Sequence, residues 1–140
     1  AQCLGTHVFE YALSPYSGNW LEARIWEEAA RFDLPLMAVR IEGGGKMPPT
    51  QSFLRVEPAE LAVSAVKRAE EDEALIVRLY NVAPTEVEGV IELWRGIARA
   101  VETDLNEEEK RPLEVEDNTR VRFKVRGHEI KTIKLSPSLP

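Results

Sequence analysis

The chain has 140 residues, enough for one domain whose core needs neither disulfides nor metal ions. Its formal net charge of −6 argues against nucleic acid or an anionic membrane surface as the main partner, and no apolar run is long enough to cross a bilayer. Cys3 is the only cysteine, which excludes an internal disulfide and fits a reducing compartment.

The first third of the chain predicts two strands around one helix. Residues 8–13 alternate large apolar side chains with smaller or charged ones, the pattern of a half-buried strand. Asn19 can cap a helix that Pro35 ends, and residues 36–41 predict a second short strand. A glycine-rich loop follows at residues 43–49. Because residue 1 is Ala rather than Met, we expect a processed chain or a piece of a larger one.

Beyond residue 50 the apolar pattern has period two, which indicates strands. The segments concerned are residues 53–57, 61–67, 75–80, 90–94, 97–105, 119–126 and 129–135. All of residues 106–111 except Asn106 are charged, and the segment predicts a solvated loop. We therefore expect an all-β fold, an antiparallel β-sandwich with one early α-helix, forming a single domain over residues 1–140.

Two strands in this set carry further information. In residues 119–126, valine and phenylalanine alternate with arginine and lysine, so one face is predicted in the core and the other in water. The outward basic stripe either binds an anion or, as we favour, pairs with acids on a neighbouring strand. In the last strand the apolar parity flips between Ile130 and Ile133, which indicates a bulge near Thr132 or burial on both faces.

No arrangement of residues predicts catalysis or metal binding. Cys3, His7 and His128 have no paired His or Cys motif beside them, so no metal site is expected. The Gly45-Lys46 pair lacks the other positions of a phosphate-binding loop, and no serine has the context of a nucleophile. The three tryptophans could form a sugar platform, although packing in the core or at an interface is the interpretation we favour.

Several motifs resemble one family, the family 38 glycoside hydrolases that are α-mannosidases. Residues 5–13 (GTHVFEYAL), followed by Pro15, Gly18 and Trp20, are similar to the family pattern G-x-H-x-F-x-Y-A-L-x-P-H-x-G-x-W. Residues 52–54 (SFL), 64–70 (SAVKRAE) and 76–80 (IVRLY) resemble S-F-L, S-A-x-K-x-A-E and x-R-L-Y-E, and residues 129–132 resemble the closing E-I-K-T strand. In order and spacing these stretches look like the C-terminal β domain of the cytosolic and bacterial branch, and this resemblance implies a cytoplasmic protein.

The chain departs from this family pattern at three positions. Tyr16 stands where the family usually has His, Asn81 replaces the acid that follows R-L-Y, and the Gly that follows this acid in the family is absent near Ala83-Pro84. Any contribution of those side chains to the family's site or domain contacts is therefore in question for this chain.

The resemblance implies a parent enzyme that is a zinc-dependent retaining α-mannosidase acting on mannose-containing glycans. In that family two His and two Asp hold the zinc ion, and a nucleophilic Asp works with a second acid. None of these residues maps onto this chain, so we expect a fragment without the catalytic domain, inactive alone, with no catalytic residue and no cofactor of its own. Its expected partners are the catalytic and helical domains of the same parent chain, through which the glycans would be reached.

Five positions are the most worth testing for proximity to the missing site: His7, Tyr16, Trp20, Arg78 and Tyr80. The alternative hypothesis is a free-standing, non-catalytic carbohydrate-binding β-sandwich, which predicts an exposed aromatic pair. A plain interaction module remains a third possibility, with a partner that the sequence does not name.

Overall fold

The structure is a computed structural model that describes residues 3–138. The chain divides into two compact units, Ala1–Gly43 and Gly44–Pro140. The first contains α1 (Ile25–Asp33), and the second contains all the strands of the described residues. The expectation that residues 1–140 form a single domain stays a prediction.

In the first unit, Asn19 caps a turn that leads into α1. Its Oδ1 atom accepts hydrogen bonds from the backbone N–H groups of Leu21 and Glu22, at 3.0 and 2.9 Å. The predicted helix start at Asn19 is nevertheless wrong, because these bonds cap a turn, and α1 itself has no side-chain cap. The regular helix starts only at Ile25, because Arg24 before it has a left-handed backbone with φ of 50°. None of the residues of α1 is buried.

The predicted strands at residues 8–13 and 36–41 are wrong for this structure. Both segments lack regular secondary structure, although their side-chain alternation is that of strands. A strand needs a neighbour to receive its backbone hydrogen bonds, and β-propensity alone cannot supply one.

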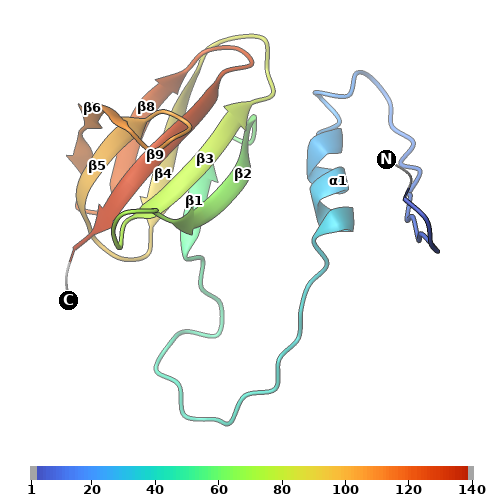
Figure 1. The fold of residues 1–140 in the computed structure, drawn as a ribbon, viewed down its shortest axis with the longest axis horizontal. Coiled ribbons are helices and arrows are strands. Elements are labelled where there is room, and N and C mark those ends of the chain that lie inside the picture. Colours follow the sequence, from blue (N-terminus) through green and yellow to red (C-terminus); the bar gives the residue numbers. More distant parts are fainter. Residues whose placement is uncertain (1–2, 139–140) are drawn as a thin grey trace. The chain divides into compact units, whose positions relative to one another are not determined.

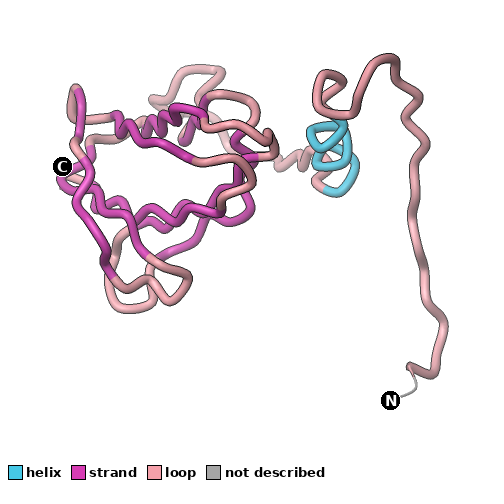
Figure 2. Tube along the Cα trace, turned by 90° about the horizontal axis from the view of Figure 1, so that it is seen from above, coloured by secondary structure: helices cyan, strands magenta, loops and turns pink. Residues whose placement is uncertain are grey.

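The second unit is a sandwich of two antiparallel sheets, as Figure 1 and the view from above in Figure 2 show. The smaller sheet has the order β1–β4–β8–β7, and the larger has the order β2–β3–β9–β5–β6. The strands are β1 (Leu54–Glu57), β2 (Leu61–Arg68), β3 (Leu75–Asn81), β4 (Val87–Leu93), β5 (Ile97–Thr103), β6 (Glu109–Leu113), β7 (Val115–Glu116), β8 (Arg120–Val125) and β9 (Ile130–Pro137). This arrangement confirms the predicted all-β sandwich with one early helix.

The core lies between the two sheets. Side chains at 0% exposure come from both layers, among them Leu79 and Ile133 from the large sheet and Ile91 and Val121 from the small one. Full burial of such a side chain contributes about 1.5–3 kcal/mol relative to exposure. In β8 the apolar side chains enter this core and the basic ones point away, as predicted.

The last strand is buried on both faces rather than bulged. Residues 131–135 of β9 are all buried, and its pairing with β3 runs without a shift. The outer face is covered because the β2–β3 loop folds over it, enclosing Ala69, Ala74 and Ile76. The predicted loop at residues 106–111 is partly wrong, since β6 begins at Glu109.

Candidate functional site

Arg78 and Tyr80, two of the predicted site residues, lie side by side on the outer face of the large sheet. They have the same parity on β3, while Leu79 between them is fully buried in the core. Cross-strand neighbours on β2 and β9 complete the surface. We call it the outer-face patch and define it as Ala62, Ala65, Arg78, Tyr80, Leu105, Ile130 and Thr132.

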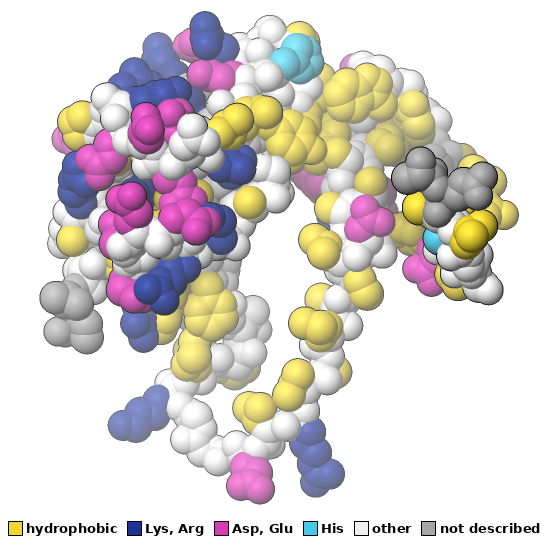
Figure 3. Space-filling model, in the orientation of Figure 1, with side chains coloured by type: hydrophobic (Ala, Val, Ile, Leu, Met, Phe, Trp, Pro, Cys, Tyr) yellow, Lys and Arg dark blue, Asp and Glu magenta, His cyan; other side chains and the backbone are white. Residues whose placement is uncertain are grey.

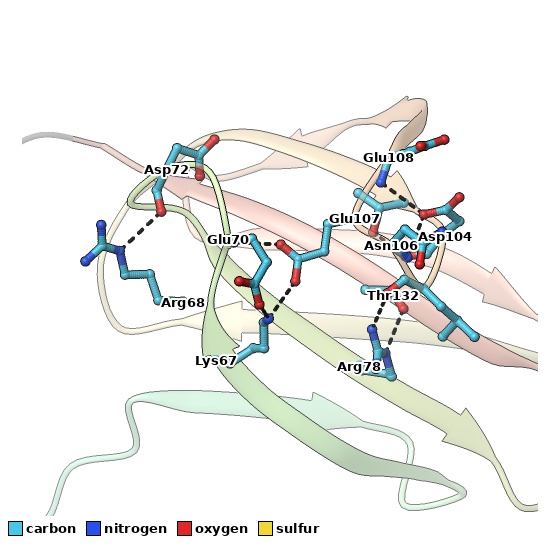
Figure 4. A network of polar contacts seen from close by, with 12 residues as sticks. Lys67, Arg68, Glu70, Asp72, Arg78, Asp104, Asn106, Glu107, Glu108 and Thr132 are labelled. Carbon is cyan, nitrogen blue, oxygen red and sulfur yellow. Dashed lines mark hydrogen bonds and ion pairs between the residues drawn. The ribbon is translucent and has the colours of Figure 1, made fainter.

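The guanidinium group of Arg78 is held in place by two hydrogen bonds. Its Nε donates to Thr132 Oγ1 at 3.2 Å and its Nη2 donates to the carbonyl oxygen of Leu105 at 3.0 Å. Figure 4 labels Arg78 and Thr132. Around it, Tyr80 (38%) and Ile130 (59%) remain exposed. The patch therefore combines an oriented cation with uncovered apolar and aromatic surface.

The other half of this outer face is closed by two loops that an ionic clamp joins. Lys67 Nζ pairs with Glu70 and lies 2.9 Å from Glu107 Oε1, while the Glu70 backbone N–H donates to Glu107 Oε2 at 2.9 Å. Figure 4 shows these contacts between the β2–β3 loop and the β5–β6 loop. Lys134 reinforces the same region by contacting Asp72 at 2.7 Å.

These ion pairs lower the pKa values of two carboxyl groups, one in the clamp and one beside it. The hydrogen bond from Lys67, and after it the one from the Glu70 backbone, lowers the pKa of Glu107. The hydrogen bond from Lys134 is the main cause that lowers the pKa of Asp72. Both carboxylates thus prefer their charged form in the folded state more than in the unfolded one.

These shifts predict a loss of stability on the acid side. Because the unfolded state binds more protons, the clamp's contribution is present above about pH 4.3, an ordinary glutamate pKa, and disappears as the pH falls through the folded-state pKa of Glu107. Glu107→Gln is expected to flatten the fall of the urea midpoint between about pH 5 and pH 3. Glu114→Gln, at an exposed position, is the matched control and should keep the wild-type slope. An unchanged slope in Glu107→Gln would contradict this role.

Asn81, where the resembling family has an acid, faces the interior rather than the patch. It is 1% exposed. Its Nδ2 donates to the carbonyl oxygens of Thr85, Val125 and Arg126 at 2.8, 3.3 and 3.1 Å, and its Oδ1 accepts from the Ala83 N–H at 2.9 Å. This departure from the pattern therefore falls on a structural contact between the β3–β4 loop and the end of β8.

The remaining predicted site residues, His7, Tyr16 and Trp20, lie in the first unit. His7 Nε2 is 3.2 Å from the Cys3 carbonyl oxygen. Tyr16 and Trp20 are exposed, and Trp20 packs edge-on against Trp26 with ring centroids 6.0 Å apart. The structure thus places Arg78 and Tyr80 on one face of the sandwich, and contact of any of the five residues with a substrate stays a prediction.

The basic stripe on β8 is neutralised by acids, as we favoured from the sequence. Each cation lies within 4 Å of a carboxylate: Arg120 with Glu92, Arg122 with Glu116 and Glu88, Lys124 with Glu86, and Arg126 with Glu129. Exposed pairs of this kind contribute little to stability, because water and salt screen the attraction between the charges. The stripe is therefore a solvated, charge-balanced surface.

Trp94, one of the tryptophans considered for a sugar platform, forms an exposed aromatic pair with Phe53, which sequence reasoning did not name. The two rings meet edge-on with centroids 5.3 Å apart, because β1 and β4 pair Leu54 with Leu93. The guanidinium carbon of Arg95 lies 4.5 Å from the Trp94 ring centroid. One ring face is thereby occupied, which leaves less flat surface for a sugar to stack on.

Within residues 3–138, no group of three His, Cys, Asp or Glu side chains is placed to hold a metal ion. No helix in that range is long and apolar enough to cross a membrane. The expectation that this chain carries no zinc ion stays a prediction.

With the sandwich and its patch established, comparison with known proteins gives the family. Residues 60–133, just over half of the chain, match the glycosyl hydrolases family 38 C-terminal beta sandwich domain. The chain therefore belongs to that family, as the resemblance predicted, and its architecture is the one the domain description names.

Two curated relatives are similar to this chain. Alpha-mannosidase 2C1 of Mus musculus is 28% identical over 108 residues, covering 75% of this chain and 10% of the relative. Alpha-mannosidase 2C1 of Homo sapiens is 28% identical over 106 residues, covering 74% of this chain and 10% of the relative. The chain thus matches about a tenth of the length of each.

Proposed function

We propose that this chain is the C-terminal accessory sandwich of a larger α-mannosidase and supports catalysis without supplying catalytic groups. The observation that carries the proposal is the match of residues 60–133 to a C-terminal domain of family 38. The parent enzyme is proposed to be a cytoplasmic, zinc-dependent retaining α-mannosidase of mannose-glycan catabolism. Its zinc ligands and catalytic acids would lie in other domains.

The outer-face patch is the surface we assign to contact with those other domains. Arg78 is oriented before any partner arrives, so less side-chain freedom is lost on docking. Tyr80, Leu105 and Ile130 offer exposed aromatic and aliphatic area, the kind of side chains that interfaces bury at their centres. A hollow of about 350 Å³ between Leu105, Ile130 and Thr132 could receive a partner side chain.

A substitution in the outer-face patch is expected to lower the activity of the parent enzyme, although the catalytic groups lie in other domains. In the proposed parent enzyme, which we call the longer polypeptide, Arg78→Ala is expected to lower kcat/KM on an aryl α-mannoside by about tenfold, equivalent to about 1.4 kcal/mol. The reason is that the docked domain loses its oriented cation. Arg120→Ala, on the small sheet, is the matched control and should leave kcat/KM unchanged.

Urea unfolding of the 140-residue chain separates this effect from simple destabilisation. Arg78→Ala should keep most of the sandwich's stability at the assay temperature, so that a loss of activity reports docking. Equal activity of Arg78→Ala and Arg120→Ala would remove the patch from the proposal.

A free carbohydrate-binding module is distinguished by titration. Mannose oligosaccharides are expected to leave the tryptophan fluorescence of the chain unchanged, because Arg95 covers one face of Trp94. A saturable fluorescence change that Trp94→Ala abolishes would favour the binding module instead.

A further inference from the structure

Arg78 is a partly buried cation of the sandwich without a carboxylate beside it. Three other cations of residues 44–138 are also partly or fully buried, and each has a carboxylate oxygen within 4 Å: Lys67, Lys131 and Lys134. The two hydrogen bonds of Arg78 go instead to neutral oxygen atoms, a hydroxyl and a backbone carbonyl. Because a cation shielded from water is costly without a counter-charge, an anion from outside the sandwich would be stabilising here.

Lys110 on β6 is a second strand cation without a carboxylate partner, and it borders the same hollow. Within residues 44–138, the other Lys and Arg side chains of the strands each lie within 4 Å of an acid. Figure 3 shows such basic and acidic side chains next to one another on the sandwich surface. Lys110 lines the hollow of about 350 Å³ with Leu105, Ile130 and Thr132. Arg78 donates hydrogen bonds to two residues of that lining, Leu105 and Thr132.

The guanidinium group of Arg78 keeps donors for a further partner. Its Nε and Nη2 atoms make the two hydrogen bonds, whereas Nη1 donates to no atom of residues 3–138. Nη1 is also accessible, because no buried side-chain nitrogen or oxygen atom in that range lacks a partner. A guanidinium group is a planar fork that matches the two oxygen atoms of a carboxylate. The free side of Arg78 is therefore suited to a carboxylate group.

The acid that lines the hollow, Asp104, is engaged by the backbone of its own loop. Its Oδ1 atom accepts hydrogen bonds from the N–H groups of Asn106 and Glu108 at 2.8 and 3.0 Å. Figure 4 shows these contacts in the β5–β6 loop, close to Arg78. Asp104 forms no ion pair with Arg78 or Lys110, since none of their nitrogen atoms lies within 4 Å of its carboxylate. Two cations and one acid leave the hollow positive, in a chain whose net charge is −6.

We propose that this hollow receives an aspartate or glutamate side chain from another domain of the longer polypeptide, whose carboxylate pairs with Arg78 beside the Lys110 ammonium group. This inference rests on the proposed function, which assigns the outer-face patch to such a contact, and it names the chemistry of the partner. A neutral sugar would leave both cations without a counter-charge. The charge pair fixes the orientation of the docked domain, while the apolar area of Tyr80 and Ile130 contributes to affinity.

Carbodiimide crosslinking of the longer polypeptide tests this contact, because the reagent joins a lysine amine to a carboxyl group that touches it. Lys110 is expected to be joined to an Asp or Glu residue outside the 140-residue chain, identified by mass spectrometry after digestion. Lys124, whose Nζ atom lies 3.6 Å from Glu86 Oε1, is the matched control and should be joined to Glu86.

Three results of the crosslinking overturn the proposal. The first is a Lys110 crosslink found only with acids of residues 1–140, which would place the partner within this chain. The second is the absence of any Lys110 crosslink while Lys124 reacts. The third is a Lys110 crosslink between two copies, recognised by mixing isotopically labelled and unlabelled polypeptide, since the partner would then be a second copy.

A double-mutant cycle in the longer polypeptide tests the pairing with Arg78 itself. Arg78→Met keeps an apolar stem and removes the charge, and the crosslinked acid is replaced by its amide. Each change alone is expected to lower the thermal midpoint by on the order of 2 °C. Both changes together should lower it no further than the larger single effect, because the pair is then already broken. Effects that simply add would show that the two side chains do not interact, and would overturn the proposal.

Crosslinking and hydrolysis together separate this inference from the proposed function. If the longer polypeptide hydrolyses an aryl α-mannoside but Lys110 is joined to no acid outside the 140-residue chain, the acidic contact fails and the function stands. If the crosslink forms but hydrolysis is absent, the acidic contact stands and the function fails.

Discussion

Asn81→Asp is expected to lower the free energy of unfolding of the sandwich by about 4 kcal/mol at pH 7, measured by urea denaturation. The Nδ2 group that donates to three carbonyl oxygens becomes a carboxylate oxygen facing the same carbonyls. The carboxylate keeps one donor, the Ala83 N–H. A buried charge that also faces several carbonyl oxygens is among the most destabilising single changes.

The pH dependence of this variant has a definite sign. Burial beside carbonyl oxygens raises the pKa of an aspartate at position 81, so the folded state binds more protons than the unfolded state. The penalty must therefore shrink as the pH falls. Asn118→Asp, exposed in the turn before β8, is the matched control and should change stability by less than about 0.5 kcal/mol. A penalty that grows toward acid pH would contradict the assigned hydrogen bonds.

Gly127→Ala is expected to cost about 3 kcal/mol, at the upper end of the range for overpacking. A methyl group at this position would overlap the carbonyl group of Pro84 and approach its Cα atom to 3.1 Å. Because these are backbone atoms, the β3–β4 loop would have to move, together with the hydrogen bond from the His128 N–H to the Ala83 carbonyl oxygen.

Gly43→Ala provides the comparison, since nothing lies within 4 Å of its added methyl group. Its free energy of unfolding should stay within about 0.5 kcal/mol of the wild type. Thermal or urea unfolding of both variants checks the pair. Equal stabilities would show that the β3–β4 loop yields without cost.

Most of the sandwich was predictable because one face of each inner strand is buried. In β8 the alternation of Val121 and Phe123 with basic residues is unambiguous. Edge strands are harder, because β6 consists largely of charged residues and is held by pairs such as Arg111 with Glu102 at 2.7 Å. A charged edge strand carries no apolar period to detect.

The same reasoning explains the wrong strands at residues 8–13 and 36–41. A period-two pattern states which side chains would share a buried face, and it contains no information on where the neighbouring strand is. The pattern at Phe9 and Tyr11 is that of a strand, while the structure offers it no partner among the described residues.

The candidate site was predictable only in part. The parity of Arg78 and Tyr80 follows from the sequence of β3, and so does their shared face. The loops that close half of that face do not follow, because the Lys67–Glu107 contact joins residues forty positions apart in polar segments. The buried hydrogen bonds of Asn81 were likewise invisible, since its partners are backbone carbonyl groups of distant residues.

Hydrolysis of an aryl α-mannoside tests the central claim most directly, with the 140-residue chain and the longer polypeptide assayed side by side. Our account predicts turnover by the longer polypeptide and none by the 140-residue chain, whose urea transition shows that its sandwich is folded. Turnover by the 140-residue chain alone, reproduced after removal of traces of other glycosidases, would contradict the assignment of an accessory role.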